Sequence, residues 1–201
     1  MENSQRLPSS SSDKEALYAE WEQWKENERP GERRAEAVSR MRECYEENAK
    51  NLDLSSMGLS QLPTLPDGVQ YLIVDNNQLT QLPALSGSLK ELSVRDNQLI
   101  RLPALPSSLK KLLANNNQLT QLSVLPDSLE ELQAHHNQLT QLPALPGSLK
   151  TLSVHNNALT HLPTLPSSLN RLLVTNNRLT QLPSTIINEL LNKPIAFSIV
   201  L

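Results

Sequence analysis

Residues 136–149 have the sequence HNQLTQLPALPGSL, and nearly the same letters occur at 76–89, as NNQLTQLPALSGSL. Close variants begin at residues 96, 116, 156 and 176, so the phrase returns every 20 residues. Units beginning at residues 49, 69, 89, 109, 129, 149 and 169 share the consensus LxxLxVxxNxLTxLPxLPxS. A fixed short period of this kind indicates a chain built from stacked copies of one structural unit.

The consensus matches the leucine-rich-repeat pattern at its shortest length. Leu72 and Val74 alternate along a short strand and therefore both point to the interior. Leu79, Leu82 and Leu85 fill the rest of the coil, and burying each is worth roughly 1.5–3 kcal/mol, which only stacked neighbours can provide. The L-P-x-L-P stretch is too rich in proline for a helix. We therefore predict an α/β leucine-rich-repeat solenoid of about seven 20-residue units, with a concave parallel β-sheet and an extended, polyproline-like convex side.

One polar position recurs where each strand ends and the coil turns. A buried amide has both donors and an acceptor, so it can satisfy the turning backbone of its own unit and of the adjacent one. Met57 occupies this position in the first unit, as expected for an edge unit that abuts a cap. We predict a structural asparagine ladder of Asn77, Asn97, Asn117, Asn137, Asn157 and Asn177.

The segment before the repeats is helical in character. Ser12 followed by Glu15 predicts a capping box at the start of a helix, and Pro30-Gly31 separates this helix from a second one. Two short helices cannot bury two tryptophans alone, so we expect them to pack on the first repeat. The apolar residues that recur at helical spacing are Leu17, Trp21 and Trp24 in the first helix and Val38, Met41 and Tyr45 in the second, with Ala37 and Cys44 beside them.

The chain is therefore predicted to have four parts. They are a polar, disordered leader (1–12), a two-helix N-terminal cap (13–48), the leucine-rich repeats (49–188) and an incomplete C-terminal cap (189–201). The last unit of a solenoid must cover its exposed leucines. Phe197, Ile199 and Val200 are the candidates for that role.

Composition argues against several classes of function. The formal charge of −3 gives no electrostatic reason to expect a nucleic acid or an anionic membrane as partner. No apolar run is long enough for a membrane span, and the N-terminal stretch lacks the apolar region of a Sec signal peptide. Cys44, the single cysteine, is better interpreted as a small hydrophobe than as a nucleophile. No phosphate loop or catalytic motif is present, so we predict a non-enzymatic chain with no cofactor and no metal.

Variation between units is concentrated at the positions that flank the buried pair of each strand. These side chains should point outward onto the concave face, because strand residues alternate. Seven strands about 4.8 Å apart make a surface about 29 Å long, which is enough for a protein partner. We predict a partner-binding surface formed by Tyr71, Ile73, Asp75, Glu91, Arg95, Lys111, Leu113, Glu131, Gln133, His135, His155, Arg171 and Leu173.

Four of these residues, Tyr71, Ile73, Leu113 and Leu173, are apolar where alternation predicts exposure. Scattered exposed apolar side chains are normal in soluble proteins, whereas interface hot spots favour such groups. We favour the interpretation as interface anchors, because departures from so regular a scaffold stand out. The charged members would tune specificity and association rate more than affinity.

Three histidines lie close together in the array, and His135 and His155 are expected to stack on adjacent strands. A metal site would need three or four ligands and supporting groups. Apart from Glu131, no acidic or cysteine residue in the variable columns completes one with His135, His136 and His155. We therefore favour plain exposed polar side chains over a metal-binding or pH-sensing role.

The run WEQWKENERPGERRAEAVSRMRECYEENAKNLDLSSMGLSQLP (21–63), followed by repeats of the form LPALPxSLKxLxVxNNQLT, resembles the bacterial leucine-rich-repeat effectors delivered by type III secretion. These include IpaH- and SspH-type ubiquitin ligases and YopM-like scaffolds. The resemblance covers about residues 13–183, and the helical segment is its most specific part. It implies that the array recognises a host protein. In the ligases, a separate C-terminal helical domain with a Cys-x-Asp motif transfers ubiquitin, and this sequence has no cysteine after Cys44.

The resemblance implies the substrate-recognition domain of a secreted effector. It would bind a host protein on its concave face and direct ubiquitination by a catalytic domain absent from this chain. One alternative is a non-enzymatic YopM-like scaffold that holds two host proteins together. Another is a partnerless array of consensus-like or engineered origin. The sequence identifies neither the host partner nor the oligomeric state.

Overall fold

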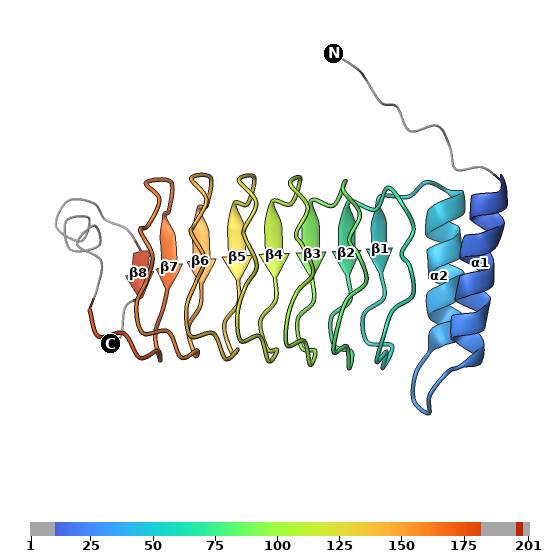
Figure 1. The fold of residues 1–201 in the computed structure, drawn as a ribbon, viewed down its shortest axis with the longest axis horizontal. Helices are drawn as coiled ribbons and strands as arrows, with labels where there is room; N and C mark the ends of the chain where they lie inside the picture. The colour runs from blue at the N-terminus through green and yellow to red at the C-terminus, as the bar shows by residue number, and fades with distance from the viewer. Residues whose placement is uncertain (1–10, 182–195, 199–201) are drawn as a thin grey trace, which may run out of the picture.

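The computed structural model describes residues 11–181 and 196–198. Helices α1 (Ser11–Glu26) and α2 (Arg34–Glu46) come first, and a single parallel sheet follows in chain order. Its strands are β1 (Asn51–Asp53), β2 (Tyr71–Ile73), β3 (Glu91–Ser93), β4 (Lys111–Leu113), β5 (Glu131–Gln133), β6 (Thr151–Ser153), β7 (Arg171–Leu173) and β8 (Ala196–Ser198). Figure 1 shows the coils stacked side by side, with both helices beyond β1 at one end. The predicted leucine-rich-repeat solenoid with a two-helix cap is confirmed.

Strands β1 to β7 follow one another in constant register. Leu52 pairs with Leu72, and Leu72 pairs with Leu92, at steps of 20 residues. The last step differs, because Arg171 of β7 pairs with Ala196 of β8, 25 residues further along. Sequence analysis did not predict this strand, since the repeat consensus has been lost before it begins. Whether the side chains predicted at 189–201 cover the final leucines lies outside the described residues.

One continuous apolar core runs from the helices through the array. Leu72 and Val74 are 1% and 0% exposed, which confirms that the alternating pair of the strand points inward. Leu79 is also fully buried, whereas Leu82 and Leu85 in the return segment are half-buried. The same positions are filled in neighbouring units, so each unit buries its leucines against the next, as the stacking argument requires.

The asparagine ladder is confirmed in detail. Asn77 Oδ1 accepts hydrogen bonds from the backbone N–H groups of Met57 (3.1 Å) and Leu59 (2.9 Å) in the preceding unit. Its Nδ2 donates to the carbonyl oxygens of Leu54 in that unit and Val74 in its own, both at 2.9 Å. Each amide therefore ties two neighbouring coils together. The same pattern recurs at Asn97, Asn117, Asn137, Asn157 and Asn177.

A second ladder of serines lies at the opposite end of the strands, and sequence analysis did not predict it. Ser108 Oγ donates to the carbonyl oxygen of Leu89 at 2.6 Å, and Ser128 Oγ to that of Leu109 at 2.6 Å. Equivalent bonds to the preceding unit are made by Ser88, Ser148 and Ser168. The signal was the serine that closes the 20-residue consensus, whose role could not be inferred without knowing where its hydroxyl points.

The residue before each ladder asparagine has left-handed backbone geometry. Asn116 has a φ of 56° and His136 a φ of 53°. Asparagine, aspartate and histidine tolerate this region better than most residues because their short polar side chains can hydrogen-bond locally. The full column is Ser56, Asn76, Asp96, Asn116, His136, Asn156 and Asn176, so a variable position in the sequence still obeys a backbone constraint.

Helix α1 begins at Ser11, which corrects two sequence-based expectations. Ser12 lies within the first turn of the helix instead of preceding it as the residue of a capping box. Ser11 and Ser12 therefore belong to the helix and not to the predicted leader. Serine is common in the first turn because its side chain bonds readily to local backbone groups. Within the described part of the chain, no helix is long and apolar enough to cross a membrane.

The two helices pack on the first repeat, as predicted. Trp21 is fully buried, and its Nε1 donates to the carbonyl oxygen of Thr64 at 2.7 Å. Trp24, Val38, Met41 and Cys44 are also buried in the shared core. The approach is close at Gly58, where a Cβ would lie 2.5 Å from the carbonyl oxygen of Gly31. A residue larger than glycine at 58 would push the cap away from the array.

A buried ion pair completes this junction. Arg34 Nε lies 2.5 Å from Glu32 Oε2, and neither side chain is more than 3% exposed. Glu32 Oε1 accepts hydrogen bonds from both the N–H and the hydroxyl of Ser60, so the carboxylate joins the helices to the first coil. Burial alone would raise the pKa of Glu32, but the hydrogen bonds from Arg34, Ser60 and the Arg29 N–H together lower it to about 2.

Candidate concave binding surface

The outward side chains of β1 to β7 and of the residue that follows each strand by one position form one face of the array, which we call the sheet face. It is the face predicted to be concave. The predicted binding residues differ in exposure across it. Tyr71, Arg95 and Arg171 are exposed, whereas Ile73, Glu91, Lys111, Glu131, Gln133, His135, His155 and Leu173 are half-buried, and Asp75 and Leu113 are buried.

Leu113 was expected to be an exposed anchor, and the structure contradicts this. It is only 6% exposed and lies in register between Ser93 and Gln133. Neighbouring strands are only about 4.8 Å apart, so side chains in the middle column cover one another. Strict alternation therefore overestimates exposure. Tyr71, at 39% exposed, and the half-buried Ile73 and Leu173 are the apolar side chains of the predicted set that a partner could reach.

Asp75 is 5% exposed because its carboxylate is fully engaged at the surface. Oδ1 accepts hydrogen bonds from Ser93 Oγ at 2.7 Å and from the Arg95 N–H at 2.8 Å. Oδ2 lies 2.7 Å from a terminal guanidinium nitrogen of Arg95. Asp75 therefore fixes the direction in which Arg95 extends, and Arg95 is the member of the pair that a partner can contact.

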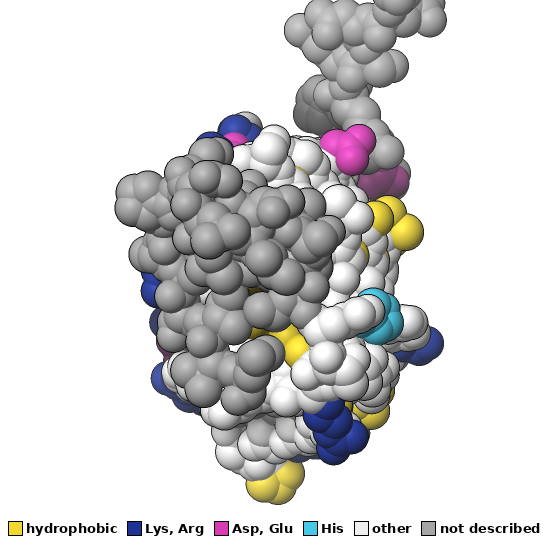
Figure 2. Space-filling view, turned by 90° about the vertical axis from the view of Figure 1, so that its left-hand side faces the viewer, with side chains coloured by type: hydrophobic (Ala, Val, Ile, Leu, Met, Phe, Trp, Pro, Cys, Tyr) yellow, Lys and Arg dark blue, Asp and Glu magenta, His cyan; other side chains and the backbone are white. Residues whose placement is uncertain are grey.

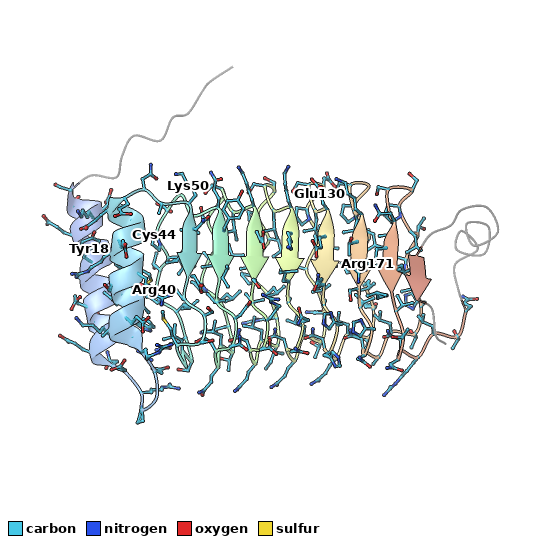
Figure 3. All side chains as sticks on the ribbon, turned by 180° about the vertical axis from the view of Figure 1, so that it is seen from behind. Tyr18, Arg40, Cys44, Lys50, Glu130 and Arg171 are labelled. Carbon is cyan, nitrogen blue, oxygen red and sulfur yellow. The ribbon has the colours of Figure 1, made fainter. Side chains whose placement is uncertain are left out.

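Charges alternate across the centre of the sheet face. Lys111 Nζ lies 3.6 Å from Glu91 and 3.7 Å from Glu131 on the strands either side. One residue earlier in the chain, Glu130 lies between Lys110 (3.7 Å) and Lys150 (2.5 Å). The hydrogen bond from Lys150 holds the pKa of the Glu130 carboxyl below its usual range. Figure 3 shows Glu130 and Lys50 at the same edge of the sheet, where the strands begin.

The histidines form a compact cluster next to this charged region. The rings of His135 and His155 stack with centroids 4.3 Å apart and planes 10° apart, and His136 packs edge-on against both. Ser153 Oγ lies 3.3 Å from Nδ1 of His135 and 3.1 Å from that of His155. Burial, followed by the charges of His155 and His136, lowers the pKa of His135 to about 4. The stacked pair is therefore neutral at pH 7 and presents a planar, weakly polar surface.

No group of three or more histidine, cysteine, aspartate or glutamate side chains in the described ranges could hold a metal ion. Cys44 is buried, its thiol donates to the carbonyl oxygen of Ala49 at 3.5 Å, and burial raises its pKa. A protonated, enclosed thiol is a poor nucleophile. Ser93 and Ser153 were not singled out from the sequence, although they hold Asp75 and the histidine pair in place.

Comparison with known proteins agrees with this architecture. A Shigella effector leucine-rich-repeat domain superposes with a TM-score of 0.83 at 38% identity, covering 90% of this chain and 81% of that one. YopM of Yersinia pestis superposes with a TM-score of 0.58 at 33% identity, over 87% of this chain and 62% of that one. No family model matches the sequence.

Two curated relatives match shorter stretches. The outer membrane protein YopM of Yersinia pestis is 41% identical over 66 residues, which is 32% of this chain and 16% of YopM. The E3 ubiquitin-protein ligase ipaH7.8 of Shigella flexneri is 42% identical over 56 residues, 28% of this chain and 10% of the ligase. The matches therefore span only a small part of each relative's length.

Fold and sheet face together define a leucine-rich-repeat recognition module capped by two helices. The similarity to the Shigella domain over four fifths of its length places the module more narrowly. The chain belongs to the bacterial leucine-rich-repeat effectors, the family that includes YopM and the IpaH ubiquitin ligases.

Proposed function

We propose that this chain is the recognition domain of an effector secreted into the host cell by type III secretion, and that its sheet face binds a host protein. The observation that carries the proposal is the separation of constant and variable positions. Leucines and ladder asparagines repeat in nearly every unit, whereas the outward columns change from unit to unit. A preformed, rigid face of this kind loses little conformational freedom on binding.

The chemistry of the sheet face suggests how a partner is read. Tyr71 and Ile73 on β2 and Leu173 on β7 provide apolar contacts near the two ends of the face. The alternating charges centred on Lys111 lie between them and are already paired within the chain. Affinity should therefore come mainly from the apolar ends and the exposed Arg171, while the central charges select against mismatched partners.

We further propose that the sheet face supplies a substrate to a ubiquitin-transferring domain carried by the parent protein. The relatedness to ipaH7.8, named as an E3 ubiquitin-protein ligase, supports this. The relatedness to YopM favours a second candidate, a scaffold that joins two host proteins without catalysis. The two candidates differ in whether the product of the complete gene moves ubiquitin from an E2 to the bound protein.

The sheet face can be tested with a Tyr71→Ala/Arg171→Ala variant. Both side chains are exposed, so the fold should survive, and circular dichroism would verify this. The matched control is Thr80→Ala/Thr180→Ala, which alters exposed positions of the same two units outside the sheet face. We expect a host protein captured from lysate by the parent chain to be lost from the Tyr71/Arg171 variant and kept by the control. Equal capture by all three would refute a sheet-face site.

The choice between ligase and scaffold needs the product of the complete gene. It would be incubated with ubiquitin, E1, E2 and the captured host protein. Modification of that host protein, lost in the Tyr71→Ala/Arg171→Ala background, would support delivery of a substrate. A ternary complex with two host proteins and no ubiquitin transfer would support the scaffold instead.

A further inference from the structure

The repeats provide an internal reference for every position, and three departures from it cluster away from the sheet face. Where other units have threonine, the third unit has Ile100, and where most have glutamine it has Arg101. Where other units have alanine or threonine, the fourth unit has Val124. All three lie in the return segment that follows the asparagine ladder. We call them, with the pocket described below, the return-segment patch.

The apolar members of this patch are the most exposed large hydrophobic residues of the described chain. Ile100 is 53% exposed and Val124 is 84% exposed. They lie in adjacent units, four coil positions apart, which corresponds to roughly 10 Å for an extended chain with units about 4.8 Å apart. On the end-on surface in Figure 2, apolar side chains reach the outside only in small areas among polar ones. Exposed isoleucine and valine in place of threonine and alanine add nothing to the core.

A pocket of about 300 Å³ lies beside these residues. It is lined by Gln81, Leu82, Arg101, Leu102 and Pro103, from the second and third units. Its floor is therefore apolar, and Arg101 supplies a cation at its edge. Most cations near the sheet face are paired with a carboxylate, but Arg101 forms no ion pair or side-chain hydrogen bond with the described residues. An unpaired guanidinium beside an apolar floor is complementary to a carboxylate next to an apolar side chain.

We propose that the return-segment patch is a second docking surface, which binds a peptide segment of a partner protein that carries a carboxylate next to an apolar side chain. The carboxylate pairs with Arg101, and the apolar side chain occupies the pocket over Leu82, Leu102 and Pro103. Ile100 and Val124 cover the flanking residues of the peptide. The patch lies in the return segments and not in the strands, so it and the sheet face can be occupied at the same time. This goes beyond the proposed function, which concerns the sheet face alone.

The repeats also provide a matched pair of test variants. Ile100→Thr/Arg101→Gln/Val124→Ala restores the consensus and should remove the patch while keeping the fold. Thr140→Ile/Gln141→Arg/Thr164→Val, added to that variant, rebuilds the three residues two units further along. The lining there, Gln121, Leu122, Leu142 and Pro143, has the same letters as the original pocket. The site should therefore move by 40 residues instead of merely disappearing.

The probe is the blocked peptide acetyl-Leu-Glu-Leu-amide, titrated into the ¹⁵N-labelled chain, with acetyl-Leu-Gln-Leu-amide as the uncharged control. We expect chemical-shift changes at Arg101 and Leu102, binding weakened about tenfold or more in the consensus variant, as for loss of one charge-assisted pair, and the changes transferred to residues 141 and 142 in the rebuilt variant. Equal binding of the glutamine peptide, equal binding by the consensus variant, or no shift at millimolar peptide would each overturn the proposal. Sedimentation showing that the patch instead mediates self-association of the chain would also overturn it.

Discussion

At the scale of single residues, the ladder asparagines do more for the array than their polarity suggests. Asn117 Oδ1 accepts from the N–H of Leu99, and its Nδ2 donates to the carbonyl oxygens of Val94 and Ala114. These backbone groups are buried where the coil turns, so no water replaces a lost partner. An aspartate would lack the donor and a leucine would lack both functions, which explains why the letter does not change from the second unit to the seventh.

Replacing Asn117 by leucine should lower the free energy of unfolding by about 2–4 kcal/mol, because several buried backbone groups lose their partner at once. Urea denaturation followed by circular dichroism measures this. Gln118→Leu is the matched control, since Gln118 is exposed and adjacent, and its effect should stay within about 0.5 kcal/mol. A loss at Asn117 no larger than at Gln118 would show that the ladder is not a source of stability.

At the scale of elements, the junction between the helices and the first coil depends on an ionised group. Glu32 is almost enclosed and bonds to Arg34 on α2 and to Ser60 in the array. Its carboxyl must be charged for both contacts to persist. The helices therefore stay docked only while Glu32 is ionised, which makes the cap the acid-sensitive part of the molecule.

The pKa of Glu32 is about 2 in the folded chain against an ordinary value of 4.5, so folding favours the ionised form. The resulting stabilisation is fully present above about pH 4.5 and is lost as the pH falls towards 2, and the shift corresponds to at most roughly 3 kcal/mol. Glu32→Gln should be less stable than the parent at pH 7, and the difference should shrink as the pH falls through this window. Glu26→Gln, at an exposed position of α1, is the control. Parallel stability–pH curves for parent and Glu32→Gln would contradict the assignment.

The sequence predicted the elements that follow a period and failed where a contact decides the structure. Leucine spacing located the strands, and the helical spacing of Trp21 and Trp24 located the cap. The Glu32–Arg34 pair could not be predicted, because two neighbouring charges on a polar helix start are ordinarily solvated, and only the docked first coil encloses them. Leu113 failed for a related reason: alternation assigns a direction to a side chain, whereas burial depends on the neighbours in the adjacent strands.

At the scale of the whole molecule, stability should be the sum of similar units and of the contacts between them. Removing residues 129–148 joins Ser128 to Leu149, the same letters as the natural Ser148–Leu149 junction. Lys111 would then pair with Thr151, and Asn157 would replace Asn137 in the ladder. Because the step between strands is 20 residues on both sides of the deletion, every contact has an equivalent donor and acceptor.

We therefore expect the 20-residue deletion to fold cooperatively, with a urea m-value lower by roughly a tenth, in proportion to the 20 of 201 residues removed. Deleting only residues 129–138 is the matched control, since half a unit shifts leucines into outward positions and breaks both ladders, and this variant should not fold. Far-ultraviolet circular dichroism and urea denaturation of the two proteins decide the matter. If the whole-unit deletion unfolds as completely as the half-unit one, the units are not interchangeable, and Glu131, Gln133 and His135 must contribute to the fold as well as to the sheet face.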